Sequence, residues 1–237
     1  MTLTRLDYPP EKLQPFGREK IMMECNTEIE RAMRVTACSK EPWTVSFIES
    51  LQPEEHFWDV GACVGSYTLI AAARGLNVVA FEPVPENAAT MTRNLALNDL
   101  LARVVILPFA LGDGEGLVWQ HRSDMRSGAA SHVMDSNVRK RTHHQTLVPI
   151  FRADAVASAL KIAVPHAIKL DVDGFEHQVL AGAAELLKHP QLRTMLIEFQ
   201  IANDASLVAW LKERGWVIDE QYPDRGGIYY ARLVRGG

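Results

Sequence analysis

Short apolar runs alternate with amphipathic stretches from residue 57 onward, and this alternation predicts a sheet that is covered by helices on both faces. Expected strands are 57–60, 78–81, 104–107, 167–170, 195–199, 216–218 and 228–233. Expected helices between them are 66–74, 85–97, 175–188 and 205–214. The last two strands follow each other through a Pro-Asp-Arg-Gly-Gly turn. We therefore predict a doubly wound, mostly parallel, seven-stranded α/β sheet of the Rossmann-like type with a terminal antiparallel hairpin.

The first 40 residues do not follow this rhythm. They combine several charges and prolines with one amphipathic stretch at 27–37, and we expect an N-terminal helical extension or lid. A helix is expected at 41–51, because Pro42 suits a first helical position and Trp43 and Phe47 lie on one helical face. The main domain is expected to span 41–237.

A second break in the rhythm separates the third and fourth expected strands. Residues 116–157 are predicted to be an insertion with short strands at 117–120 and 146–151. The insertion is rich in histidine, arginine and lysine, and connections of this length often carry function. Its histidines lack the spacing of a zinc site, which favours exposed loop residues over metal ligands.

Composition places the chain among ordinary globular proteins, with 237 residues, 47% hydrophobic and 23% charged. The net charge of −4 provides no general attraction for nucleic acid or an anionic membrane, so a small-molecule partner is expected. The basic residues of the insertion also lack the interleaved aromatics that stack on bases. Three cysteines without close pairing and the absence of a long apolar run favour a cytoplasmic location.

A glycine turn follows the first expected strand. Asp59-Val60-Gly61 leads through Ala62 to Gly65 and Ser66, where the next helix begins. Glycines in such a turn let a ligand approach the backbone, at the edge where open α/β sheets bind ligands. Glu82 ends the next strand, where an acid accepts hydrogen bonds from both ribose hydroxyls. Together the two features predict an adenosine-containing ligand.

Two common nucleotide sites do not fit this turn. Its glycine spacing differs from the G-x-G-x-x-G fingerprint of dinucleotide enzymes, and no Gly-Lys-Ser/Thr sequence forms a phosphate loop. Asp59 before the turn suits a ligand with a cationic amino-acid tail, because its carboxylate can organise the loop or meet the ammonium.

Several motifs in order resemble the FkbM family of S-adenosylmethionine-dependent methyltransferases. They are Asp59-Val60-Gly61-Ala62 with Gly65, Phe81-Glu82-Pro83 with Asn87, Asn94 and Asn98, Ala110-Leu111-Gly112-Asp113, the stretch 168–176 with 179–183, and 196–198. Cys63 stands where this family commonly has asparagine, and Asp173 where glutamate is usual.

The resemblance implies a class I methyltransferase fold and S-adenosylmethionine as cofactor. The glycine turn would hold the methionine part, Glu82 the ribose, and the region around 110–113 the adenine. Cofactor contacts are accordingly expected from Asp59, Gly61, Ala62, Gly65, Ser66, Glu82, Pro83, Ala110, Leu111, Asp113 and Asp171. Family members O-methylate sugars and natural products, so a hydroxyl on such a molecule is the expected acceptor.

Two acids at neighbouring strand ends are the candidates for catalysis. Asp171 ends the fourth expected strand and is the first candidate for the general base, ahead of His121, His132 and Asp154. Glu198 ends the fifth in an apolar run, which makes it a candidate substrate ligand. The two could share a magnesium ion, but a metal-free site is favoured. Asp173 could equally cap the following helix, and Glu176 could complement its dipole.

The residues together with the resemblance imply an O-methyltransferase. One alternative is a non-catalytic cofactor-binding module of the same fold, for which the departure at Cys63 leaves room. Another is a nicotinamide-dependent oxidoreductase, which the glycine spacing disfavours.

Overall fold

The structure is a computed structural model that describes residues 21–122, 126–129, 144–201, 204–223 and 226–236, and the backbone of 11–12 and 133–135. Within these residues, no helix combines the length and apolar character needed to cross a membrane.

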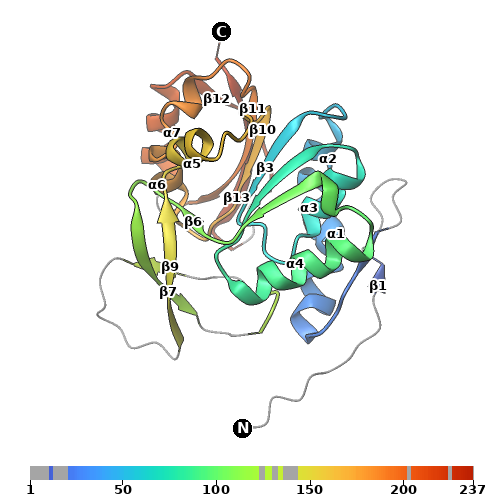
Figure 1. Cartoon of the computed structure of the whole chain (residues 1–237). Coiled ribbons are helices and arrows are strands. Elements are labelled where there is room, and N and C mark those ends of the chain that lie inside the picture. Colours follow the sequence, from blue (N-terminus) through green and yellow to red (C-terminus); the bar gives the residue numbers. More distant parts are fainter. Residues whose placement is uncertain are drawn as a thin grey trace.

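The centre of the molecule is a seven-stranded sheet (Figure 1). Across the sheet the strands are β12 (Trp216–Gln221), β13 (Ile228–Arg235), β11 (Thr194–Gln200), β10 (Ala167–Leu170), β3 (His56–Val60), β4 (Asn77–Phe81) and β5 (Val104–Leu107). Only β13 runs antiparallel to its neighbours β11 and β12; the other pairs are parallel. The expected strands and the terminal hairpin are confirmed.

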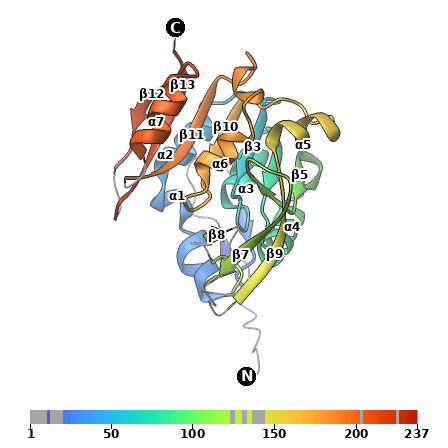
Figure 2. The same cartoon turned by 90° about the vertical axis from the view of Figure 1, so that its left-hand side faces the viewer.

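Helices cover both faces of this sheet, as Figures 1 and 2 show. One face carries α2 (Pro42–Glu49), α3 (Ser66–Ala73) and α4 (Pro85–Leu97), and the other carries α5 (Ala153–Ala159), α6 (Glu176–Ala181) and α7 (Asp204–Lys212). Both faces are buried, and neighbouring residues of one strand therefore enter different cores. In β3, Phe57 packs toward α2 and α3, while Trp58 belongs to the core on the other side. This double burial explains why the strands read as continuous apolar runs.

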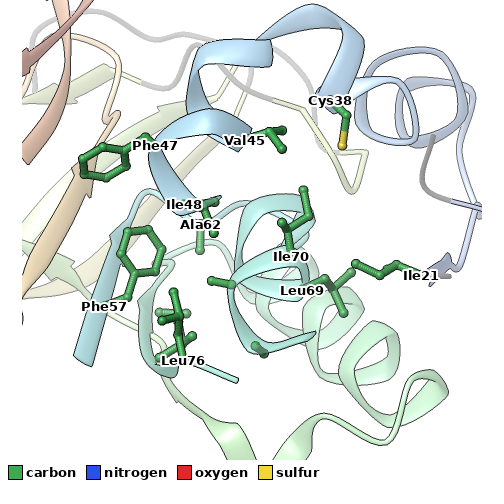
Figure 3. Close-up of a cluster of buried hydrophobic side chains, with 14 of the residues drawn as sticks. Ile21, Cys38, Val45, Phe47, Ile48, Phe57, Ala62, Leu69, Ile70 and Leu76 are labelled. Atoms are coloured by element: carbon green, nitrogen blue, oxygen red, sulfur yellow. The ribbon is translucent and has the colours of Figure 1, made fainter. Parts of the chain in front are cut away.

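The described part of the N-terminal segment is integrated into the first core. Figure 3 shows Ile21 and Cys38 beside Leu69 and Ile70 of α3. The segment contains β2 (Met22–Met23), which pairs with β1 (Glu11–Lys12), a π-helical turn at Glu30–Arg34 and α1 (Ala37–Lys40). The helix expected at 27–37 is therefore broken into two short turns.

Two asparagines, Asn94 in α4 and Asn98 directly after it, hold this segment in place. The Asn98 amide accepts a hydrogen bond from the Met22 N–H (2.8 Å) and donates one to the Met22 carbonyl (2.7 Å). Asn94 accepts from the Glu24 N–H (2.7 Å). These bonds pair buried backbone groups, and they fix the segment over the carboxyl edge of the sheet.

The expected insertion forms a second, four-stranded sheet in the order β6 (Ala110–Leu111), β9 (His144–Phe151), β7 (Gly116–Arg122) and β8 (Val133–Asp135). Strands β7 and β9 lie where strands are expected. Helix α5, at the end of the insertion, was not expected.

The helix expected at 175–188 is wrong in length. Helix α6 ends at Ala181, and a 3-10 turn follows only at Leu186–Lys188. The Asp154 carboxylate accepts hydrogen bonds from the N–H groups of Glu185 (3.0 Å) and Leu186 (2.9 Å). The Asp154 N–H in turn binds the Gly182 carbonyl (3.1 Å). Helical N–H groups that are taken by a side chain cannot continue the helix.

Candidate active site

Three adjoining cavities lie at the carboxyl ends of β3, β4 and β10. The apolar cavity, of about 30 Å³, is lined by Val60, Gly61, Phe81, Pro83, Phe109, Ala110, Leu111, Val172 and Phe175. The Glu82 cavity, of about 100 Å³, is lined by Arg34, Gly61, Cys63, Glu82, Pro83, Asn87, Gln120, Ala129, Asp171, Val172 and Asp173. The Tyr230 cavity, of about 230 Å³, lies between the glycine turn, the N-terminal segment and β13. Gly61 lines all three, so they form one continuous groove.

The glycine turn tolerates no side chain at its two glycines. Gly61 has a φ of +82°, and a Cβ there would lie 1.9 Å from the Asp171 carbonyl oxygen. Gly65 has a φ of +87°, and its Cβ would lie 2.7 Å from Met91 Cγ. Glycine is needed at both positions for the left-handed backbone and for the close approach of neighbouring atoms.

Glu82 is buried where β4 ends. One carboxylate oxygen accepts a hydrogen bond from the Cys63 N–H and the other from the Val84 N–H, both at 2.8 Å. Burial raises the pKa of Glu82 to about 7, although these backbone donors oppose the shift. Oε1 also accepts a longer bond from Asn87 Nδ2 (3.5 Å), whereas Oε2 keeps a lone pair for a further donor. The carboxylate therefore suits a ligand hydroxyl at Oε2, and a second hydroxyl at Oε1 in competition with Asn87.

The apolar cavity continues from the Glu82 cavity through Pro83 and Val172. Ala110 and Leu111 of β6 line it, together with the aromatic rings of Phe109 and Phe175. Such a surface suits a flat heteroaromatic ring. Asp113, expected beside it, is exposed and is not a lining residue.

Asp59 is fully buried and lines none of the three cavities. It accepts a hydrogen bond from Thr68 Oγ1 (2.6 Å), and its other oxygen lies 3.7 Å from the Lys169 ammonium. Of the two roles expected for Asp59, the geometry permits the organisation of the loop and leaves no direct path to a ligand.

Asp171 follows β10 and borders both the Glu82 and the Tyr230 cavities. Its Oδ2 accepts hydrogen bonds from Lys169 Nζ (3.2 Å) and from the Tyr230 hydroxyl (3.0 Å). Burial opposes ionisation, yet the Lys169 ammonium holds the pKa of Asp171 below its usual value. Its Oδ1 has no hydrogen-bond partner among the described residues. Asp171 is therefore an ionised carboxylate with one oxygen free.

Tyr230 joins Asp171 to Glu198. It lies directly opposite Glu198 in the β11–β13 ladder, and its hydroxyl is 2.9 Å from Glu198 Oε2. Burial, reinforced by the Asp171 carboxylate, raises the pKa of Glu198 to about 9. The sequence contains no signal that singles out Tyr230, since a tyrosine in an apolar strand reads as a core residue.

The N-terminal segment adds two cations to the Tyr230 cavity. Arg34 lines this cavity and the Glu82 cavity, and its Nε donates a hydrogen bond to the Gly128 carbonyl (2.8 Å). Lys40 lines the Tyr230 cavity and pairs with Glu41 (2.8 Å). Ala62 and Ser66 of the glycine turn also line this cavity, and Ser66 Oγ donates a hydrogen bond to the Arg34 carbonyl (3.1 Å).

A comparison with known protein families decides the assignment. Residues 59–218, two thirds of the chain, match the model of the methyltransferase FkbM domain. The chain belongs to this family. The match begins at Asp59 and includes Glu82, Asp171 and Glu198, while Arg34 and Tyr230 lie outside it. The family favours methyl transfer over the nicotinamide chemistry that the glycine spacing already disfavours.

Individual relatives of this FkbM domain are distant. It is 25% identical over 142 residues to the hexuronic acid methyltransferase AglP of Haloferax volcanii, covering 60% of this chain and 55% of AglP. The chain thus spans just over half the length of that relative.

Solved structures show the same fold. One is the precorrin-6y C5,15-methyltransferase of Geobacter metallireducens, with a TM-score of 0.54 and 12% identity over 87% of this chain and 92% of that one. Another is Sp1610 of Streptococcus pneumoniae in complex with S-adenosyl-L-methionine, with a TM-score of 0.53 and 12% identity over 84% and 72% of the two chains.

Two further acids of the FkbM domain, Asp173 and Glu176, lie in and after the loop that follows β10. Glu176 accepts hydrogen bonds from the N–H groups of Val172 and Gly174, both at 3.1 Å, and so fixes the loop after β10. Asp173 lines the groove with a φ of +55°, and no side-chain bond from it caps α6.

Of the three alternative bases expected from the sequence, the two that the structure describes do not line the groove. Asp154 is engaged at the end of α6, and His121 in β7 bonds to Gln145 (3.3 Å) instead of lining the cavities. His132 lies outside the described residues. A search of the described residues finds no group of three or more His, Cys, Asp or Glu side chains placed to hold a metal ion.

Proposed function

We propose that this FkbM domain transfers the methyl group of S-adenosylmethionine to a hydroxyl group of a sugar or a similar small metabolite. The observation that carries the proposal is the position of Asp171. It is an ionised carboxylate with a free oxygen, where the Glu82 cavity meets the Tyr230 cavity. A base at this junction would face the acceptor from one side and the methyl donor from the other.

The groove fits the cofactor part by part. The apolar side chains around Ala110 and Leu111 would line one side of the adenine, Glu82 would accept bonds from the ribose hydroxyls, and Ala62 with Ser66 would border the methionine part. The structural neighbour Sp1610, solved with S-adenosyl-L-methionine, supports this choice of cofactor.

When bound, S-adenosylmethionine supplies an electrophilic methyl group on a sulfonium. The task of the chain is then to align the acceptor oxygen with that methyl group and to remove its proton. Asp171 Oδ1 would accept the proton from the acceptor hydroxyl while Lys169 and Tyr230 hold Oδ2. General-base catalysis of this kind contributes roughly 10²–10⁴ in rate.

The acceptor is best sought among acidic sugars. The relative AglP is named for a hexuronic acid. Of the three cations that line the Tyr230 cavity, Lys40 pairs with Glu41 and Lys169 with Asp171, while the terminal nitrogens of Arg34 have no hydrogen-bond partner among the described residues. A sugar carboxylate would find a charge-assisted partner there.

The test is transfer from S-adenosylmethionine to a panel of glucuronic acid, galacturonic acid and the matching neutral hexoses, with the products identified by mass spectrometry and NMR. We expect methyl ethers of the uronic acids and slower reaction of the hexoses. Tight binding of S-adenosylhomocysteine without turnover of any hydroxyl compound would contradict the proposal and favour the non-catalytic alternative.

A further inference from the structure

The Tyr230 hydroxyl lies between two carboxyl groups and carries a single hydrogen. Its oxygen is 3.0 Å from Asp171 Oδ2 and 2.9 Å from Glu198 Oε2, and both distances are those of hydrogen bonds. A phenol can donate to only one of these oxygens. The second contact is favourable only if the other partner donates a hydrogen to the Tyr230 oxygen.

Charge identifies Glu198 as that donor. Lys169 is buried and lies within 4 Å of both Asp59 and Asp171, so these two acids share one ammonium. In the described part of the chain, Glu198 forms no ion pair, and its Oε1 has no hydrogen-bond partner. An unpaired carboxylate is much more costly to bury than a neutral carboxylic acid.

The groups that face Glu198 reinforce this assignment. Burial is the largest cause that raises the pKa of Glu198 to about 9, and the negative charges of Asp171, Glu176 and Asp173 add to it. Charged groups on the other walls of the Tyr230 cavity are Arg34, Lys40, Glu41 and Lys169.

We propose that Glu198 is held as a neutral acid that donates its hydrogen to Tyr230, and that Tyr230 thereby acts as a positioning residue whose own hydrogen fixes Asp171. The proposal rests on the proposed role of Asp171 as the base. In turnover, Asp171 Oδ1 takes the acceptor proton while the acceptor oxygen bonds to the methyl carbon. The carbon–sulfur bond breaks, its electron pair stays on sulfur, and Asp171 later releases the proton to water.

The arrangement assigns different roles to two acids that the sequence presents alike. Asp171 removes the proton, and Glu198 keeps one. If Glu198 ionises at high pH, two carboxylates compete for the single Tyr230 hydrogen, and Asp171 loses a donor. The rate should therefore fall on the alkaline side, through the titration of Glu198.

The test is infrared spectroscopy of the full chain without acceptor, which detects the carbonyl band of a protonated carboxylic acid. We expect a stronger band in the wild type than in Glu198→Gln at pH 7, because Glu82, whose pKa is about 7, contributes to both spectra. The difference between the two spectra should disappear when the pH is raised through the titration of Glu198. Absence of a protonated Glu198 at pH 7 would overturn the proposal. If Glu198→Gln does not fold, carbon-13 NMR of labelled glutamate in the wild type and in Tyr230→Phe provides the same titration.

Turnover provides the second arm of the test. Glutamine keeps a donor toward Tyr230 and stays neutral, so Glu198→Gln should lose less than tenfold in kcat and should lack the alkaline fall. Tyr230→Phe should lose tenfold or more in kcat with little change in KM. A loss of all turnover in Glu198→Gln would make Glu198 a base and overturn the proposal.

Tyr229→Phe is the matched control. Tyr229 is the preceding residue of β13, lies in the opposite core and donates to Asp204 (3.0 Å), so its loss should leave the band and the pH profile unchanged. The spectra require no acceptor. Failure to find a sugar substrate would therefore count against the proposed function only. The spectra would still show whether Glu198 is protonated.

Discussion

The two halves of the groove are built in different ways. The half around the apolar and Glu82 cavities comes mostly from residues 60–111, where each contact follows closely on a strand end. The half around the Tyr230 cavity combines Arg34, Asp171, Glu198 and Tyr230, which come from an N-terminal segment and three strands. Motifs that are short and continuous in the sequence, and that contact the same ligand, are consistent with a cofactor that the whole family uses. Ala62 and Ser66 of the glycine turn also line the Tyr230 cavity, so only the distant segments of this half can change with the acceptor without altering the cofactor site.

We expect the largest effect on stability at Gly61, which lines all three cavities and so belongs to both halves of the groove. Gly61→Ala should destabilise the fold strongly, because its Cβ would lie 1.9 Å from the carbonyl oxygen of Asp171. Gly75→Ala is the control, since Gly75 has a similar φ of +86° but its Cβ would meet only Pro53 at 3.5 Å. Urea unfolding should show a loss of about 1–2 kcal/mol for Gly75→Ala and a clearly larger one for Gly61→Ala. Equal losses would show that the contact with Asp171 is not tight.

Glu82 tests the cofactor half alone. Glu82→Ala should weaken S-adenosylhomocysteine binding about 10- to 100-fold, because buried ribose hydroxyls would lose a charged partner. In the wild type the affinity should fall as the pH drops through about 7, since protonation removes an acceptor lone pair from Glu82. Calorimetric titration between pH 5 and 9 measures both effects. Glu115→Ala, at an exposed site before β7, is the control. An unchanged affinity in Glu82→Ala would show that Glu82 does not bind the ribose.

Asn98 tests the acceptor half through its N-terminal wall. Asn98→Ala removes the two hydrogen bonds to Met22 and should cost roughly 1–3 kcal/mol in the free energy of unfolding. We also expect faster proteolysis within 21–40 and a higher acceptor KM, because Arg34 and Lys40 are carried by this segment. Asn77→Ala, which affects a bond to Glu54 at the surface, is the control. An unchanged acceptor KM would show that this segment does not contribute to acceptor binding.

The smallest effect is expected at Cys63. Its φ of +52° lies in the left-handed region, which asparagine adopts more readily than cysteine. Cys63→Asn should therefore raise the unfolding free energy, by about 1 kcal/mol at most. A thermal melt measures this, and a clear loss of stability would show that the packing of the half-buried thiol outweighs the backbone preference.

Sequence reasoning was most successful where a feature is local. The strand pattern, the glycine turn and Glu82 depend on neighbouring residues, and the structure places them as expected. The length of α6 could not be predicted in this way. The N–H groups of Glu185 and Leu186 donate to Asp154 of the insertion, and the periodicity of apolar residues contains no information on such a contact.

The acceptor half was predictable only in part. Asp171 and Glu198 could be found because acids stand at the ends of apolar runs. Tyr230 could not, because an apolar strand containing tyrosine is ordinary, and its role depends on the register that sets it opposite Glu198. Asp59 was expected near the ligand, but its pairing with the buried Lys169 depends on two strands lying side by side.

The central claim is that Asp171 is the base at the junction of the two halves. The most direct measurement compares Asp171→Asn with the wild type in S-adenosylhomocysteine affinity and in single-turnover methyl transfer to the best acceptor. The account predicts an affinity within a few-fold of the wild type and a rate lower by roughly 10²–10⁴. A variant that binds normally and transfers the methyl group at the rate of the wild type would contradict it.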